Sequence, residues 1–141
     1  MPTYQRAVPV LQVINVETSL RWYIDVLGFK ADTFPQSPPY SFAILRRDQA
    51  EIMLQCGEQP RTVSYSQNRA DAEFVWSVYL RIAGTSVLEV ANAVEQKAGL
   101  LRGPEQMFYG LVEFEICDPD GHRVCVSGQA PPGVHVKLHQ E

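Results

Sequence analysis

The sequence has little of three features that would place it in a specialised class of protein. Three cysteines occur among its 141 residues, at Cys56, Cys117 and Cys125, and no two of them have the CxxC spacing. Neither a disulfide framework nor a zinc knuckle is indicated, and we expect reduced thiols. No run approaches the roughly 18 apolar residues that span a bilayer, and the first residues lack the apolar run of a secretion signal. We therefore expect a cytoplasmic protein with no membrane partner.

Positive charge and phosphate-binding motifs are also scarce. Twelve Lys and Arg residues stand against sixteen Asp and Glu residues, which gives a formal net charge of -4. This balance argues against nucleic acid as a partner and favours a cationic small molecule. The sequence has neither a P-loop nor a GxGxxG motif, so it implies no nucleotide. With 45% hydrophobic residues, the chain is large enough for one core, and we expect residues 1–141 to form a single domain.

What the sequence does contain is one pattern that occurs twice. A strand-like run at 10–16 precedes a helical segment at 17–27 that ends at Gly28, and a second run at 78–82 precedes a helix that ends at Gly99. Both helices carry apolar residues at the spacing of a one-sided amphipathic helix. These stripes are Leu20, Tyr23, Ile24 and Leu27 in the first copy and Val87, Val90, Ala91, Val94 and Ala98 in the second.

Each predicted helix is followed by three short strand-like segments. They lie at 29–34, 40–46 and 51–56 in the first copy and at 100–102, 111–117 and 123–127 in the second. The predicted fold class is therefore α+β, with two tandem βαβββ modules that indicate a duplication. The expected organisation is a first module at 7–57, a linker at 58–73, a second module at 74–128 and a tail at 129–141.

The segment DPDGH, residues 118–122, separates the last two predicted strands. Pro119 favours the second position of a type I turn, and Gly121 supplies the positive-φ residue of a three-residue hairpin loop with a bulge. His122 closes this turn. We interpret His122 as a solvated hairpin residue rather than a catalytic group.

Three stretches of the sequence together resemble a known family. They are VLQVINVETSLRWYIDVLGF (10–29), EIMLQC (51–56) and YGLVEFEICDPDGHRVCV (109–126). They resemble the vicinal oxygen chelate superfamily, which includes glyoxalase I, extradiol dioxygenases, fosfomycin-resistance enzymes and bleomycin-resistance proteins, and the likeness extends over nearly all of 7–128. This resemblance implies a cup-shaped mixed sheet with the helices on the outside and the ligand site inside.

The resemblance also implies where a metal would be held. Enzymes of the superfamily use four side chains, usually two His and two Glu, one on the first and one on the last strand of each module. The corresponding residues here are Val8, Met53, Ser77 and Cys125. Divalent ions prefer imidazole and carboxylate ligands, so we expect no metal and no cofactor, as in the bleomycin-resistance branch. An alignment shift of one or two residues would bring Glu51 or Glu115 to a metal position, and a divergent metal site stays as the alternative.

Alternation along the strands predicts which side chains face the cup. If Cys125 points inward, the period of two brings Glu113, Glu115 and Ser127 to the same face. The apolar residues of that hairpin then face the helix; they are Val112, Phe114, Ile116, Val124 and Val126. The predicted ligand-binding residues are Tyr40, Phe42, Glu51, Met53, Gln55, Ser77, Tyr79, Arg81, Tyr109, Glu113, Glu115 and Cys125.

The predicted cup residues allow two interpretations. Three carboxylates against Arg81 would make the cleft anionic and suited to a cationic ligand. Alternatively, these carboxylates are only the solvated face of a one-sided sheet. Tyr40, Phe42 and Tyr109 are suited to stacking on a planar ligand, and equally to core or dimer contacts. We assign neither Trp22 nor Trp76 to the site.

No set of residues in the sequence indicates a nucleophilic enzyme. Ser77, Ser127 and Cys125 have no histidine nearby in the sequence to act as a base, and we interpret His135 and His139 as mobile residues of the tail. Carboxylates around Cys125 would raise the pKa of its thiol and make it a poor nucleophile. We therefore predict no catalytic residue.

Two hypotheses about function follow. The first is a metal-independent homodimer, similar to bleomycin-resistance proteins, that sequesters a cationic or aromatic small molecule. The second is a metal-dependent lyase, dioxygenase or thiol transferase of the superfamily with a divergent ligand set. The identity of the ligand, the binding of bleomycin-class compounds, and whether one chain or two complete each cup stay open at this point.

Overall fold

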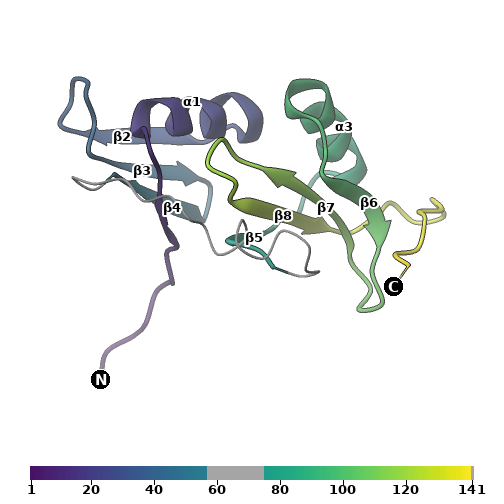
Figure 1. Cartoon of the computed structure of the whole chain (residues 1–141). Helices are drawn as coiled ribbons and strands as arrows, with labels where there is room; N and C mark the ends of the chain where they lie inside the picture. Colours follow the sequence, from purple (N-terminus) through teal and green to yellow (C-terminus); the bar gives the residue numbers. More distant parts are fainter. Residues whose placement is uncertain (57–74, 141) are drawn as a thin grey trace.

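The computed structural model describes residues 1–56 and 75–140, and the expected linker 58–73 lies outside them (Figure 1). The first βαβββ unit consists of β1 (Val10–Gln12), α1 (Val16–Leu27), β2 (Lys30–Phe34), β3 (Phe42–Arg47) and β4 (Ala50–Gln55). The second consists of β5 (Val78–Arg81), α3 (Val87–Ala98), β6 (Arg102–Gln106), β7 (Val112–Cys117) and β8 (Arg123–Gly128). The predicted α+β fold with two tandem units is confirmed. None of the helices in the described ranges is long and apolar enough to cross a membrane.

The two units have the same sheet topology. Their strand orders are β1-β4-β3-β2 and β5-β8-β7-β6, and in each sheet the first strand pairs in parallel with the last. We call these sheets A and B. The helices α1 and α3 contact one another and lie on the same side of the two sheets, as Figure 1 shows. The opposite face of each sheet is therefore the one available to a cup, which agrees with the prediction that the helices lie outside.

Local sequence signals explain where the helices begin and end. The Asn15 side chain accepts a hydrogen bond from the backbone N–H of Thr18 at 2.9 Å, and Gly28 ends α1 with a φ of 72°. The Ser86 hydroxyl caps α3 in the same way. The predicted stripes are buried except at their margins, because Ile24 and Ala98 are exposed and Val90 is half-buried.

The strands alternate as predicted. In the β7–β8 hairpin, Phe114 pairs with Val126 and Ile116 with Val124, and all four side chains are in the core. The intervening residues, Glu113, Glu115, Cys125 and Ser127, share the other face of sheet B. In sheet A, Leu54 lies between Leu11 and Ala43 on the core face, which leaves Met53 and Gln55 on the opposite face.

The DPDGH segment forms the predicted turn, but its role is larger than expected. The Asp118 N–H donates to the His122 carbonyl at 2.9 Å, and Gly121 has a φ of 84°. The interpretation of His122 as a solvated residue is wrong, because its side chain is only 5% exposed. Its Nε2 lies 2.8 Å from the Gln12 carbonyl oxygen, and its Nδ1 lies 3.1 Å from Ser77 Oγ. The ring therefore connects β1 to the residue before β5.

Two carboxylates of the same turn bind the first module. Asp120 accepts hydrogen bonds from the Ile14 N–H at 3.0 Å and from the Ser19 hydroxyl at 2.8 Å. Asp118 accepts one from the buried Tyr23 hydroxyl at 2.7 Å. Buried polar groups must be paired, so these contacts hold the two modules in one relative position.

Candidate functional site

A cleft of about 910 Å³ lies between the two modules. One wall is β5, and the other is the segment before β1 together with the turn between β3 and β4. Four of the predicted ligand-binding residues line it: Glu51, Ser77, Tyr79 and Arg81. The structure thus brings residues of both modules to one concavity, which core-face residues such as Leu27, Phe29 and Val126 also line.

The face of sheet A opposite α1 is apolar at its centre and exposed. Met53 pairs with Val10 on one side and with Ile44 on the other. Phe42 contacts Phe34, with ring centroids 5.8 Å apart. Val10 and Phe34 are 49% and 47% exposed, so this face keeps apolar surface in contact with solvent. It is a surface that a ligand or a second protein surface can cover.

The polar residues on this face of sheet A pair with one another or with arginines. The Gln12 amide donates to the Gln55 side-chain oxygen at 3.1 Å. Glu51 accepts from Arg46 Nε at 3.1 Å and lies 3.5 Å from Arg6. The expected strand at 40–46 begins instead at Phe42, and Tyr40, which lies before it, packs against the core.

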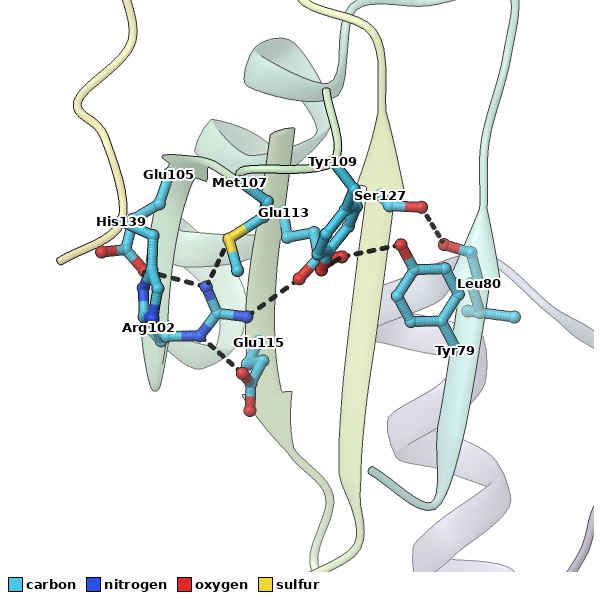
Figure 2. A network of polar contacts seen from close by, with 10 residues as sticks. All are labelled: Tyr79, Leu80, Arg102, Glu105, Met107, Tyr109, Glu113, Glu115, Ser127 and His139. Atoms are coloured by element: carbon cyan, nitrogen blue, oxygen red, sulfur yellow. Dashed lines mark hydrogen bonds and ion pairs between the residues drawn. The ribbon is translucent and has the colours of Figure 1, made fainter. Parts of the chain in front are cut away.

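The corresponding face of sheet B holds a connected polar network centred on Arg102 (Figure 2). The Arg102 guanidinium contacts Glu115 at 2.5 Å, Glu105 at 2.8 Å and Glu113 at 3.2 Å. It also lies 3.5 Å from the Met107 sulfur. Sequence reasoning missed Arg102 as a site residue because Gly103 and Pro104 are unfavourable in a strand. No strand beginning at Arg102 was therefore predicted. A strand assigned to 102–106 would have placed Arg102 beside Glu115.

This network corrects both interpretations of the carboxylates. Glu113 and Glu115 are 0% and 4% exposed, so neither belongs to a solvated face. Arg102, rather than Arg81, is the cation that pairs with them. Although burial opposes both shifts, the ion pairs raise the pKa of Arg102 and lower the pKa of Glu105. The acidic charge expected to attract a cation is therefore partly neutralised within the chain.

Two tyrosines close the network on the side away from Arg102. Tyr79 donates its hydroxyl to Glu113 Oε2 at 2.7 Å, and Tyr109 donates to the same oxygen. Burial and the Glu113 carboxylate raise the pKa of both hydroxyls, so they stay protonated as donors. Figure 2 shows both rings converging on Glu113 from different segments of the second module. One buried carboxylate thus fixes the orientation of two of the predicted aromatic residues.

These tyrosines border an open hollow of about 400 Å³. In the described ranges, four aromatic side chains line it: Trp76, Tyr79, Phe108 and Tyr109. Trp76 lies 5.0 Å from Tyr79 between ring centroids, and Phe108 lies 4.9 Å from Tyr109. The sequence interpretation omitted Trp76 and Phe108. The available signal was the Phe108-Tyr109 pair immediately before Gly110, in the turn that joins β6 to β7.

The residues that correspond to the superfamily's metal ligands do not fit a divalent ion. Cys125 is buried, and burial followed by Glu113 and Glu115 raises the pKa of its thiol, as predicted. Ser77 contacts His122, and Val8 and Met53 offer no hard donor. The alternative ligands Glu51 and Glu115 are already paired with Arg46 and Arg102. Among residues 1–56 and 75–140, no three His, Cys, Asp or Glu side chains are arranged to hold a metal ion.

Two histidines differ from the sequence interpretation. Ser77 has no histidine near it in the sequence, yet the fold brings His122 to it. Since both ring nitrogens of His122 have partners and the ring is buried, we assign it a structural role. His139 is not mobile surface, because its side chain is 10% exposed and its Nδ1 lies 3.2 Å from Glu105. The neighbouring Lys137 carbonyl accepts from the Gln106 N–H at 2.7 Å, so this part of the predicted tail lies along β6.

Fold and site together define a small two-module α+β protein with a cleft between its modules. The chain matches the Glyoxalase/Bleomycin resistance protein/Dioxygenase superfamily over residues 6–126, and it belongs to that superfamily. The predicted resemblance is confirmed. No match was found among curated protein sequences.

Three solved structures are similar to this chain. A virulence protein of Salmonella typhimurium is 25% identical with a TM-score of 0.63, covering 92% of this chain and 100% of that one. TioX of Micromonospora sp. ML1 is 18% identical with a TM-score of 0.66, covering 92% and 100%. The bleomycin-binding protein of Streptomyces verticillus, solved with copper(II)-bleomycin, is 20% identical with a TM-score of 0.61, covering 93% and 99%. The last two identities establish a common fold and nothing further.

Proposed function

We propose that this chain is a small-molecule-binding protein that sequesters an aromatic or cationic ligand without metal chemistry. The observation that carries the proposal is the aromatic hollow beside the inter-module cleft. Tyr79 lines both concavities, so a ligand in the cleft can stack its planar part in the hollow. Pockets with mostly apolar walls and a few fixed polar groups are typical of small-molecule sites.

The low reactivity of the carboxylates and the buried thiol at the site also supports the proposal. In the described part of the chain, the carboxylates of the two sheets are paired with arginines, and the buried thiol of Cys125 has a raised pKa. Sequestration requires affinity and abundance, and no bond has to break. The bleomycin-binding protein has the same fold and holds copper(II)-bleomycin, which makes a bleomycin-class glycopeptide a reasonable first probe. A role in antibiotic resistance and a cytoplasmic location belong to this proposal.

A homodimer is part of the same proposal. The strands β1 and β5 are edge strands of their sheets, and the apolar face around Val10, Met53 and Phe34 is exposed. A second copy would cover such surfaces. Sedimentation equilibrium should give a mass near twice the 15.9 kDa of one chain. A single species of 15.9 kDa at micromolar concentration would remove the dimer from the proposal.

The tryptophans provide a direct test of the ligand site. Trp76 lines the hollow, whereas Trp22 packs on Tyr23 in α1. Titration of metal-free protein with metal-free bleomycin should change the fluorescence of the Trp22→Phe variant and leave the Trp76→Phe variant almost unchanged. Calorimetry on the same samples should give one ligand per chain. No saturable heat with bleomycin would exclude that ligand, and equal responses of both variants would place binding elsewhere.

The metal-dependent alternative has its own test. Protein expressed in medium with manganese, iron, nickel and zinc and then desalted should contain much less than one metal per chain. A stoichiometric metal that is lost on Glu51→Gln or Glu115→Gln would overturn the proposal. Arg46→Ala serves as the control, because it removes a partner of Glu51 and keeps the carboxylate.

A further inference from the structure

The aromatic hollow has a composition that indicates the chemical class of its occupant. Trp76 and Tyr79 form one pair of rings and Phe108 and Tyr109 the other, and both tyrosine hydroxyls bind one carboxylate oxygen of Glu113. We infer that the hollow is an aromatic cage for a quaternary ammonium group carried by a small molecule. This inference rests on the proposed function and specifies which part of a ligand the hollow recognises.

The rings attract positive charge through their faces. An aromatic face carries the negative part of the ring quadrupole, and a cation within about 6 Å of the centroid is stabilised. The chain already shows this attraction, because the Arg81 guanidinium carbon lies 5.9 Å from the Tyr79 centroid. Several rings around one hollow add their contributions, and cages of this kind are suited to methylated ammonium groups.

The charge behind the rings strengthens the same preference. Glu113 is fully buried and accepts from both tyrosines, and a phenol that donates to an anion becomes a richer π-donor. In the described part of the chain, Glu105, Glu113 and Glu115 lie near two cations around the hollow, Arg102 and the exposed Arg81. One negative charge in excess therefore remains behind the rings when His139 is neutral.

The lining distinguishes a quaternary ammonium from a primary one. A primary ammonium carries three N–H donors, and each must find an acceptor when it leaves water. Among residues 1–56 and 75–140, those that line the hollow are all aromatic, and the hydroxyls of Tyr79 and Tyr109 are directed to Glu113. A quaternary group has no N–H to satisfy, so it loses least on entering.

The test compares choline with 3,3-dimethylbutan-1-ol, its neutral isostere, in ligand-observed NMR titrations. The choline methyl signal should move upfield under the ring currents and saturate, with a Kd about tenfold lower than that of the isostere. Ethanolamine should bind more weakly than choline. Equal affinities of choline and the isostere would show a merely hydrophobic hollow and overturn the inference.

Two variants locate the effect. Phe108→Leu removes one exposed ring of the hollow and should weaken choline binding several-fold, whereas Tyr4→Leu, an exposed aromatic of the N-terminal segment, should not. Glu113→Gln should lower the choline-to-isostere ratio of affinities, and its circular dichroism checks that it folds. A choline affinity unchanged in Phe108→Leu would also overturn the cage.

The bleomycin titration separates the two proposals. If bleomycin changes Trp76 fluorescence while choline shows no saturable shift, the ligand site stands and the cage is wrong. If neither probe binds, the cage is wrong and bleomycin is excluded as the ligand. A peptide with trimethyllysine, bound in preference to choline by more than about tenfold, would contradict the small-molecule occupant.

Discussion

Sheets A and B have the same strand order, but the side chains on their concave faces differ in chemical character. In sheet A one row across the strands reads Val10, Met53, Ile44 and Asp32, and the equivalent row in sheet B reads Tyr79, Cys125, Glu115 and Arg102. The row in sheet A is apolar at its centre and partly exposed. The row in sheet B is a buried ion pair beside a buried thiol.

This contrast shows which positions folding constrains in a duplicated module. The core faces agree, since Leu11 and Leu54 in sheet A correspond in register to Leu80 and Val126 in sheet B. Packing against a helix requires apolar side chains at these positions in both modules. Neither α1 nor α3 packs on the concave faces, so packing does not require apolar residues there. These residues can therefore differ between the modules, with ligand contact on one sheet and a polar network on the other.

The largest expected effect on stability comes from removing one arginine from each sheet in turn. Arg102→Ala leaves three carboxylates without their cation, two of them buried, and should lower the free energy of unfolding by about 3 kcal/mol. Arg46→Ala on sheet A removes ion pairs that are mostly solvent-exposed and should have little effect. Urea denaturation of both variants measures the difference, and equal losses would contradict the contrast.

A charge-neutral variant separates uncompensated charge from lost packing. Arg102→Met combined with Glu113→Gln and Glu115→Gln removes two buried charges along with the cation. Replacing a buried ion network by neutral groups of similar size is often nearly neutral for stability. The combined variant should therefore recover most of what Arg102→Ala loses. Failure to recover it would mean that Arg102 acts mainly through its packed stem.

The next test compares the effect on stability of the β7–β8 turn with that of the β3–β4 turn. The β7–β8 turn contacts the first module, where Asp118 accepts from the buried Tyr23 hydroxyl and from the His122 N–H. Asp118→Ala leaves these donors unpaired and should cost about 2 kcal/mol. Asp48→Asn in the exposed β3–β4 turn keeps a residue type that tolerates its φ of 52° and should cost much less. Similar losses would show that the DPDGH turn does not join the modules.

Acid should affect the network of sheet B through Glu105. Its ion pair with Arg102 lowers its pKa against the opposing effect of burial. The stabilisation is therefore fully present above the ordinary value of 4.5 and is lost as the pH falls through the folded pKa. Stability of Glu105→Gln should fall less steeply between about pH 5 and pH 3. An unchanged slope in urea titrations would mean that Glu105 is not stabilised by Arg102.

The repeated fold could be predicted because its signals are local. The Asn15 cap, the Gly28 stop and the alternation in the β7–β8 hairpin each depend on residues close in sequence. The same alternation correctly placed Glu113, Glu115 and Cys125 on one face. Such signals identify a face, but they do not identify the partner that a side chain meets there.

Three of the residues that sequence reasoning missed or misjudged depend on contacts between separate segments. Arg102 meets Glu115 only because β6 lies beside β7. His122 is buried because its turn reaches Gln12, 110 positions away in the chain. Trp76 joins the hollow because the β6–β7 turn folds over beside β5. A single sequence contains no periodic signal for any of these three contacts.

Thiol chemistry gives the finest comparison of the two faces. Met53 on β4 and Cys125 on β8 occupy equivalent rows, so Met53→Cys in a background of Cys56→Ser and Cys117→Ser presents one thiol on each face. Cys125 is 0% exposed, and burial followed by its acidic neighbours raises the pKa of its thiol. Ellman's reagent at neutral pH should therefore modify the thiol at position 53 at least about tenfold faster than Cys125. The parent without Met53→Cys reports Cys125 alone, and both thiols should react at similar rates in denaturant. Equal rates in the folded protein would mean that the concave face of sheet B is as open as that of sheet A, and that the polar network is ligand surface rather than a sealed support for the tyrosines.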